Sequence, residues 1–320
     1  MRAGVAIVLP VHDAADFVGR AVAQLQAQSH EDFDCVVVDD GSQDGTVERF
    51  TDELAGDVRF TVVALPENRG VAAARNAAVA RVDREWVWFV DVDDEIAPDA
   101  VETLLAATGA DVDLVLCSAV EVHEGRERVV PGPSVGVLPG RDLVRAFLAG
   151  DLPGYLWNKM FRRSVLGDAP FPSLSSKSDV TAMVSLLDRV RAARVIEPVL
   201  YRYVRREGSI TGSKVNRAVN ALAPARAMRD QDWEHRYPDL QPELAMYRMR
   251  SALAYIHDAH RFGYQPRWRE EIDQLPGWRS WRGAAHSWRD GRRRVALKGA
   301  AMCLAPEVWA RVVARWGTTR

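Results

Sequence analysis

The sequence predicts an α/β protein in which a mostly parallel, doubly wound sheet is followed by a helical C-terminal region. In the first 120 residues, short apolar runs alternate with segments whose apolar residues recur at helical spacing. Strands that alternate with helices in this way form a parallel sheet with right-handed crossovers. From residue 216 onward the periodicity is only helical, and several prolines interrupt it.

Six apolar runs have the length and composition of strands: residues 3–9, 35–38, 58–65, 86–90, 112–120 and 195–204. Apolar residues at helical spacing predict helices over residues 17–25, 47–54, 71–82, 99–107, 143–148 and 180–190. Residues 130–140 contain three prolines and three glycines and are predicted to form a surface loop.

Composition and cysteine usage indicate an ordinary globular protein of the cytoplasm. The 320 residues are long for one core, so one domain with an appendage and two domains are both compatible with the length. Cys35, Cys117 and Cys303 lack metal-binding spacing, and reduced core cysteines suit a cytoplasmic protein. Residues 1–9 lack the features of a signal peptide, and no apolar stretch approaches the roughly 18 residues that a membrane span needs.

A cluster of carboxylates follows the fourth predicted strand, where residues 86–90 lead into Asp91, Asp93 and Asp94. Two carboxylates about 4 Å apart repel by roughly 4 kcal/mol at an effective dielectric near 20, so a shared cation is a simple explanation. Hard oxygen ligands favour Mg²⁺ or Mn²⁺. An acidic turn that caps the helix starting near Pro98 is the open alternative.

A second acidic turn, Asp39 and Asp40, follows the second predicted strand in the same way. Both turns are therefore expected at one edge of the sheet, where open α/β sheets bind ligands. A simple turn motif is the alternative for these two residues.

A third segment, residues 68–70, opens the helix that contains Arg75, and a helix N-terminus with arginine nearby suits a nucleotide phosphate. The sequence contains neither a Walker lysine motif nor G-x-G-x-x-G, so neither a P-loop nor a dinucleotide-binding fold is indicated.

Taken together, residues 8–13, 38–46, 68–76 and 89–94 resemble, in order and spacing, the inverting family 2 glycosyltransferases of GT-A fold. Residues 156–163 and 200–211 resemble the acceptor half of bacterial members that build surface polysaccharides. The resemblance covers roughly residues 3–213. It implies a hexosyltransferase-type enzyme that binds a nucleotide sugar with residues 1–110 and an acceptor with residues 111–215, followed by a helical region at 216–320.

The resemblance also implies roles for single residues. The nucleotide pocket would be lined by Pro10, Val11, Asp40, Asn68, Gly70 and Arg75. The metal ligands for Mg²⁺ or Mn²⁺ would be Asp91, Asp93 and Asp94. Trp157 and Lys159 would lie in the acceptor or sugar pocket, and Asp179 would be the general base. The expected donor is a nucleotide-diphosphate sugar, first of all a UDP-sugar, and the expected acceptor is a hydroxyl of a glycan or lipid-linked glycan.

The sequence departs from the family pattern at two places. Ser178 stands where an acid is common before the base, and His12 and Asp13 replace the usual Tyr-Asn. Asp179 could also serve as a helix N-cap, which is compatible with a role as base.

Two rival functions are compatible with parts of this pattern. One is a phosphatase with an aspartyl nucleophile, although Glu95 occupies the position where that chemistry usually has Thr or Val. The other is a non-catalytic module that binds nucleotide sugar or a membrane surface, motivated by the missing acid at position 178.

The C-terminal residues 279–320 carry ten Lys and Arg residues against Asp290 and Glu307, whereas the first 278 residues are net negative. Tryptophans are interleaved with these basic residues at positions 278, 281, 288, 309 and 316. Such a composition on amphipathic helices predicts peripheral docking to an anionic membrane surface. A helical subdomain with a solvated basic face is the alternative, and the acidic remainder of the chain argues against nucleic-acid binding.

Overall fold

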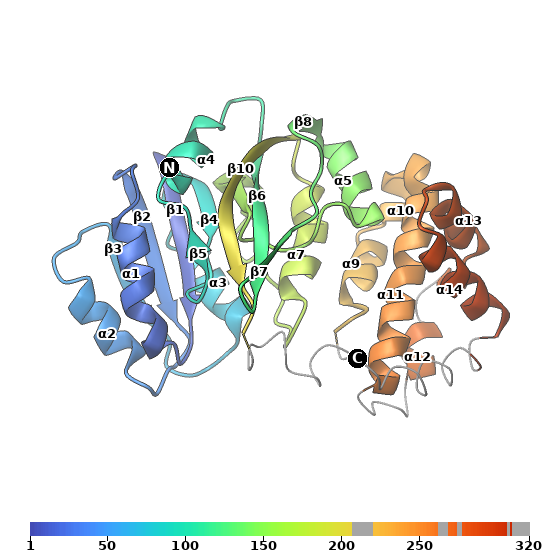
Figure 1. Ribbon diagram of the computed structural model, residues 1–320, viewed down its shortest axis with the longest axis horizontal. Helices are drawn as coiled ribbons and strands as arrows, with labels where there is room; N and C mark the ends of the chain where they lie inside the picture. The colour runs from blue at the N-terminus through green and yellow to red at the C-terminus, as the bar shows by residue number, and fades with distance from the viewer. Residues whose placement is uncertain (207–219, 262–267, 274–276, 306–307, 309–320) are drawn as a thin grey trace. The chain divides into compact units, whose positions relative to one another are not determined.

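The computed structural model describes residues 1–206, 220–261, 268–273, 277–305 and 308. The chain divides into two compact units, which we describe separately. Unit 1 comprises Met1–Leu143, Pro153–Leu174 and Ser178–Glu207, and unit 2 comprises Val144–Leu152, Ser175–Lys177 and Gly208–Arg320. Unit 1 contains the sheet, and unit 2 contains the C-terminal helices (Figure 1).

The described part of unit 1 forms one sheet with the strand order β3-β2-β1-β4-β9-β6-β10-β5, to which β7 and β8 add by pairing with β6 and β10. The strands are β1 Arg2–Val11, β2 Phe33–Asp39, β3 Phe60–Ala64, β4 Arg84–Phe89, β5 Glu95–Ile96, β6 Leu114–His123, β7 Arg126–Val129, β8 Gly136–Pro139, β9 Lys159–Arg162 and β10 Ala192–Val204. The first four strands of this order are parallel to one another, and β6 is parallel to β10. The short β9 is antiparallel to both β4 and β6 and so joins the two parallel groups.

Helices connect these strands. In the first half they are η1 Ala15–Phe17, α1 Val18–Gln26, α2 Thr46–Glu53, α3 Val71–Val79, α4 Ala100–Ala106, α5 Gly140–Ala149, α6 Arg163–Leu166 and α7 Ser178–Leu187. The C-terminal helices are α9 Ala223–Asp230, α10 Trp233–Arg236, η3 Pro238–Leu240, α11 Gln241–Arg261, α12 Trp268–Asp273, α13 Trp281–Arg289 and α14 Arg293–Leu304. Helices α1 and α2 lie side by side, and α3 packs on β1 and β2 (Figure 1).

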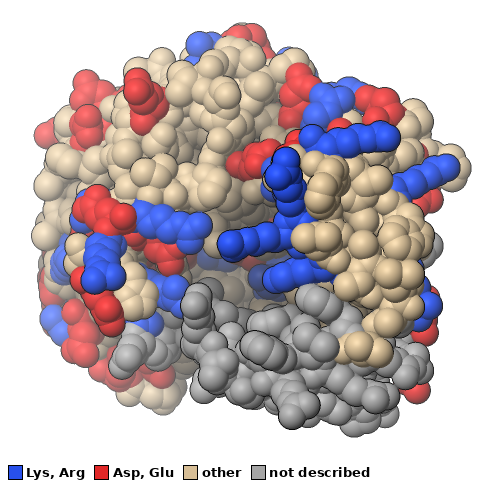
Figure 2. Space-filling view, turned by 45° about the vertical axis from the view of Figure 1, so that its right-hand side comes forward, with Lys and Arg blue, Asp and Glu red and all other residues tan. Residues whose placement is uncertain are grey.

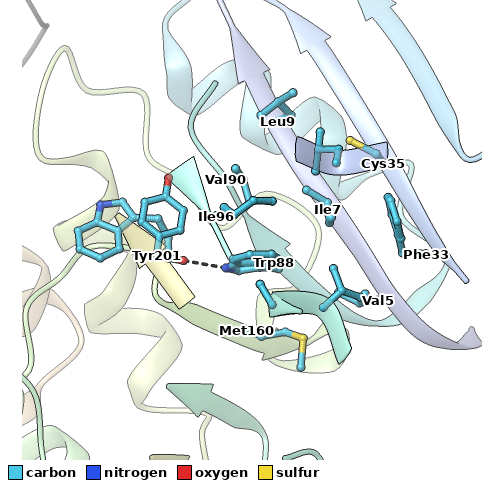
Figure 3. Close-up of a cluster of buried hydrophobic side chains, with 14 of the residues drawn as sticks. Val5, Ile7, Leu9, Phe33, Cys35, Trp88, Val90, Ile96, Met160 and Tyr201 are labelled. Carbon is cyan, nitrogen blue, oxygen red and sulfur yellow. Dashed lines mark hydrogen bonds between the residues drawn. The ribbon is translucent and has the colours of Figure 1, made fainter. Parts of the chain in front are cut away.

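The core of unit 1 explains why its strands are continuously apolar. Val5, Ile7 and Leu9 project from one face of β1 and Ala6 and Val8 from the other, and all five are buried. A strand buried on both faces is typical of parallel sheets covered by helices. On the first face, these side chains share a cluster with the aromatic and apolar residues of β4, as Figure 3 shows.

The predicted α/β class and the mostly parallel sheet are confirmed, and each of the six predicted strands overlaps an observed one. The prediction of a loop over residues 130–140 is wrong for Gly136–Pro139, which pairs with β10. Three of the four residues of this strand are exposed, so its sequence lacks the alternation of apolar and polar residues that predicts a strand. Strand β9 lies in a segment for which we predict no element. The basic C-terminal residues 309–320 lie outside the described residues.

Both signs of charge occur close together on the face drawn in Figure 2, where Lys and Arg side chains lie among Asp and Glu side chains. This mixture agrees with the small net charge of −2. No helix in the described ranges has both the length and the apolar character needed to cross a membrane.

Candidate functional site

The carboxyl ends of β1, β2 and β4 form one edge of the sheet, because the three strands are parallel and adjacent. Pro10 and Val11 are paired with the last residues of β2, and the Asp40 amide donates to the Val11 carbonyl at 2.8 Å. Asp91 follows the end of β4 at the same edge. The structure therefore places the two acidic turns at the same edge of the sheet, on either side of β1, as the sequence pattern predicts.

Asp40 holds the loop that precedes α3. Its buried carboxylate accepts hydrogen bonds from the backbone amides of Arg69, at 2.8 Å, and Gly70, at 2.7 Å. Gly41 has φ +73, and a Cβ there would lie 2.6 Å from the amide nitrogen of Asn68. Only glycine fits this close approach of two backbones. Both oxygens of Asp40 thus shape the loop at residues 67–70.

The loops after β1 and β2 are cross-linked by hydrogen bonds. The Asp13 amide donates to Ser42 Oγ at 2.8 Å, and Asp13 Oδ1 accepts from the Gln43 amide at 2.9 Å. Asn68 Nδ2 lies 2.8 Å from His12 Nε2, so the third loop joins this network. The unusual His12-Asp13 pair is therefore part of the framework that links the three loops.

Arg75 projects from α3 to the second acidic turn. Its Nη2 donates to Asp91 Oδ1 at 3.0 Å, and its buried Nε has no hydrogen-bond partner among the described residues. The next residue, Asn76, bonds both the carbonyl and the amide of Phe171, at 2.8 and 3.0 Å. A cavity of about 280 Å³ adjoins this part of α3 and is lined by Arg69, Ala72, Ala73, Asn76, Phe171 and Ser173.

The three carboxylates of the second turn differ in their surroundings. Asp94 is buried, and its oxygens accept from Tyr201 O–H at 2.6 Å and from the Val204 amide at 2.9 Å. Burial, and then the charge of Asp91, raises the pKa of Asp94 to about 8. For Asp93, burial and the charge of Asp91 also raise the pKa. The Asp93 carboxylate is hydrogen-bonded by its own backbone amide, and no side chain of another described residue donates a hydrogen bond to it.

The backbone of this turn is held by helix α1. Arg20 Nη2 donates to the Asp93 carbonyl at 2.5 Å, and Gln24 bonds the Asp94 carbonyl and the Ile96 amide at 3.3 and 2.9 Å. Gln28, two residues beyond the end of α1, donates to the Ala97 carbonyl at 2.9 Å and accepts from the Val101 amide at 3.1 Å.

Our sequence reasoning missed these polar side chains, as it missed Arg206, which donates to the Asp93 carbonyl at 2.5 Å. Arg20 and Gln24 are polar residues four apart on an amphipathic helix, and this spacing is a signal that could have pointed to them, because residues four apart share a helix face.

The residues available to a divalent cation are Asp91 and Asp93. Within the described ranges, no group of three or more His, Cys, Asp or Glu side chains is arranged to hold a metal ion. The two oxygens of Asp94 accept from Tyr201 and from the Val204 amide, and its role as a third ligand stays a prediction. Asp93 fits a hard cation, since a bound positive charge would offset the desolvation that raises its pKa.

Trp157 and Lys159, the predicted acceptor residues, lie inside unit 1. The Trp157 ring stacks on Tyr155 at 5.1 Å and on Tyr201 at 4.8 Å between centroids. Lys159 is 0% exposed, and its Nζ donates to the Tyr155 carbonyl and to Asn158 Oδ1 at 2.7 and 2.8 Å. In this arrangement neither predicted side chain offers a surface to an acceptor, whereas Tyr155 is 44% exposed.

Asp179 lies in the first turn of α7, directly after the buried Ser178. Its Oδ1 accepts from the Val180 amide at 2.7 Å, so its second oxygen can serve another partner. The charge of Asp179 is one of the influences on Lys159, which places the two groups in the same part of unit 1.

The buried Lys159 predicts an unusual dependence of stability on pH. Burial lowers its pKa to about 7 from the ordinary 10.5, opposed by Cys117 and Asp179. Between these values the unfolded chain binds more protons, so the contribution of Lys159 to folding stability rises with pH across this window. We expect the wild type to gain a few kcal/mol over Lys159→Met on going from about pH 7 to about pH 10, at roughly 1.4 kcal/mol per pKa unit.

Urea denaturation of both proteins across this pH range measures the difference. The control is Lys298→Met, which changes an exposed lysine of α14. Its free energy of unfolding should depend on pH in the same way as that of the wild type. If the free energies of unfolding of Lys159→Met and the wild type changed equally with pH, the lowered pKa of Lys159 would be contradicted.

Comparison with known proteins identifies relatives for most of unit 1. The model of the family described as glycosyl transferase family 2 matches residues 6–168. The putative glycosyltransferase EpsH of Bacillus subtilis is 27% identical over 165 residues, which are 51% of this chain and 48% of EpsH. The succinoglycan biosynthesis protein ExoU of Rhizobium meliloti is 31% identical over 224 residues, 65% of this chain and 64% of ExoU. The chain thus spans about half of EpsH and less than two thirds of ExoU.

Solved structures with low sequence identity share the fold. S. aureus TarS 1–349 in complex with UDP-GlcNAc has a TM-score of 0.60 at 18% identity, covering 93% of this chain and 91% of that one. The mannosyltransferase PcManGT from Pyrobaculum calidifontis, in complex with GDP-Man and Mn²⁺, has a TM-score of 0.58 at 17% identity. The match covers 99% of this chain and 88% of PcManGT. The predicted GT-A fold is confirmed.

Proposed function

Because the chain belongs to glycosyl transferase family 2, we propose that it transfers a sugar from a nucleotide-diphosphate donor to a hydroxyl of a glycan or lipid-linked acceptor. The observation that carries this proposal is the convergence of Asp40, the 67–70 loop, and the Arg75–Asp91 pair at one edge of the parallel strands. The UDP-GlcNAc bound by TarS favours a UDP-sugar as donor. In this proposal, residues 1–110 bind the donor with help from Arg206, residues 111–215 bind the acceptor, and residues 216–320 form a helical appendage.

The nucleoside would bind against Pro10 and Val11, beside Asn68 and Gly70. Asp40 contributes by fixing the loop that carries the last two residues, since its oxygens accept two backbone amides. The diphosphate would receive hydrogen bonds from two buried guanidinium nitrogens that lack partners among the described residues, Arg75 Nε and Arg206 Nη1. An unpartnered buried donor is costly, and an anionic ligand removes that cost.

Asp91 and Asp93 would hold Mg²⁺ or Mn²⁺ together with the diphosphate. The bound ion would act as a Lewis acid for the leaving nucleoside diphosphate. The Mn²⁺ bound with GDP-Man in PcManGT supports a divalent ion at such a site. Arg20 and Arg206 assist by holding the Asp93 carbonyl, which fixes the turn from which both carboxylates project.

Asp179 would act as the general base in a single, inverting displacement. The acceptor hydroxyl passes its proton to the Asp179 carboxylate as its oxygen bonds to the anomeric carbon, and the bond from that carbon to the diphosphate oxygen breaks. The exposed Tyr155 ring, backed by Trp157, lies in the same unit and offers the acceptor an aromatic surface.

A non-catalytic module that binds nucleotide sugar is the second candidate, favoured by Ser178 in place of an acid. The two candidate functions differ in whether the protein converts the nucleotide sugar to products. Incubation with UDP-sugars and a glycan acceptor yields a glycosylated product or free UDP for an enzyme, and neither for a binding module.

The first test of donor binding is a thermal-shift screen of UDP, GDP, CMP, dTDP and ADP with and without Mn²⁺. A ligand at 100 times its Kd stabilises the native state by about 2.7 kcal/mol, so we expect UDP with Mn²⁺ to raise the Tm by several degrees. Arg75→Gln should weaken this shift, because it removes the guanidinium next to Asp91. Arg81→Gln, an exposed change just after α3, is the matched control. The absence of a shift with every nucleotide would overturn the proposed donor site.

A further inference from the structure

Helices α13 and α14 of unit 2 expose two tryptophans and two leucines and bury mostly small residues. Trp281 and Trp288 of α13 are 55% and 50% exposed, and Leu297 and Leu304 of α14 are 62% and 75% exposed. The members of each pair are seven residues apart, which places them on one face of their helix. The buried positions of the two helices are Gly283, Ala284, Ser287, Ala296, Gly299 and Met302.

Packing against α11 requires the small residues. A Cβ on Gly283 would lie 2.8 Å from the Ala245 carbonyl oxygen, and one on Gly299 would lie 2.1 Å from Met249 Sδ. At Gly283 the close atoms are backbone, so a larger side chain there would push α13 away from α11, whereas at Gly299 the buried Met249 side chain would have to move. The two helices thus pack on α11 through these glycines, and their tryptophan and leucine side chains remain exposed.

Basic residues surround the exposed face. Six exposed cationic side chains lie on or next to the two helices: Arg279, Arg282, Arg289, Arg293, Arg294 and Lys298. The one acid in the sequence 277–305 is Asp290, which pairs with Arg292. The Arg293 guanidinium lies over the Trp288 ring at 5.6 Å, so aromatic and cationic groups form one surface. We name this surface, Trp281, Trp288, Leu297 and Leu304 with the six cations, the α13–α14 face.

We propose that the α13–α14 face docks on an anionic lipid surface. Helices with tryptophan and leucine on a face rimmed by Arg and Lys lie in the plane of a membrane interface, with the apolar side chains at the headgroup boundary. Tryptophan favours that depth, and each basic residue adds attraction to anionic lipids. The excess of positive charge on this surface selects an anionic membrane over a neutral one.

The inference goes beyond the proposed function, because docking needs no donor and no transfer. If transfer to a lipid-linked acceptor also holds, docking would bring the enzyme to the surface where that acceptor resides. A failure of either idea can be recognised separately, since vesicle binding is measured without nucleotide sugar.

The test is flotation of the full-length protein with vesicles of phosphatidylcholine alone or mixed with phosphatidylglycerol. We expect the wild type to float with the anionic vesicles only, and to be released by high salt. The double variant Trp281→Ser/Trp288→Ser should lower the vesicle partition coefficient at least about tenfold. Arg282→Glu/Lys298→Glu should lower it by a similar factor, because it replaces two attractive charges by two repulsive ones.

Two matched controls change exposed residues of β7 and β8 in unit 1 in the same way. Val129→Ser/Val137→Ser removes exposed apolar side chains, and Arg126→Glu/Arg128→Glu makes the same change in net charge. Both should float like the wild type, and circular dichroism verifies that every variant is folded.

Three results would overturn the proposal. The wild type could fail to float with anionic vesicles, or the tryptophan variant could float as well as the wild type. Sedimentation could also show a self-associated wild type and a monomeric tryptophan variant, neither binding vesicles. That last result would make the α13–α14 face an interface between two copies of the chain.

Discussion

Asp179→Asn is expected to lower kcat about 10²- to 10⁴-fold, the range typical of a lost general base. Asparagine keeps the size of the side chain and its place in the first turn of α7, but it cannot take the proton of the acceptor hydroxyl. The donor does not need this proton transfer to bind, so the thermal shift with UDP and Mn²⁺ should be unchanged. Steady-state transfer kinetics and the shift together measure both quantities.

Two further variants sharpen this test. Asp168→Asn, an exposed change in the same unit, should keep full activity. Ser178→Glu restores the acid that is common at that position, and it shows whether serine limits the rate. Full activity of Asp179→Asn would remove Asp179 from the reaction and leave it the role of a helix-capping residue.

Asp93→Asn is expected to lower kcat at least about 10²-fold and to abolish the Mn²⁺-dependent part of the UDP thermal shift. The neutral amide replaces the Asp93 carboxylate, so the proposed ion would lose an anionic ligand. The fold should survive, because the hydrogen bonds that hold the turn go to the Asp93 carbonyl and not to its side chain. The Tm without ligands should rise or stay equal, since the mutation removes a carboxylate whose pKa is raised by burial.

The control for Asp93 is Asp52→Asn, which removes an exposed carboxylate of α2 and should leave kcat and metal response intact. Isothermal titration of Mn²⁺ in the presence of UDP measures ion binding directly. Wild-type Mn²⁺ affinity in Asp93→Asn would show that the ion, if bound, uses other ligands.

Much of the sheet edge formed by the carboxyl ends of β1, β2 and β4 could be predicted, because the sequence patterns that indicate it are local. Alternating apolar runs and helical periods identify parallel strands, and Asp40 and Asp91 follow two of them at the same position. Turn residues such as Gly41 identify the tight loop, whose φ of +73 only glycine adopts readily. The predicted mostly parallel sheet is confirmed, and the two acidic turns lie at the same edge of it.

The acceptor side could not be predicted to the same depth. Strand β9 has four residues and gains its hydrogen bonds from β4 and β6, so its own sequence carries little information. From the sequence we predict that Lys159 lies in the acceptor or sugar pocket. In the structure it is buried, and the Tyr155 carbonyl and the Asn158 amide oxygen accept hydrogen bonds from its amine. A buried amine needs such partners, and sequence spacing does not show them.

The sequence by itself determined the class of fold, the edge at which the carboxylates gather and the basic, tryptophan-rich character of the C-terminal region. These features depend on periodicity and composition, which neighbouring residues carry. Only the tertiary structure decided which carboxylates remain available and which faces remain exposed. Asp94 is held by Tyr201, 107 residues away, and Gly283 and Gly299 pack on α11 while the tryptophans of α13 and the leucines of α14 stay exposed. Such contacts join distant segments, so they exist only once the chain is folded.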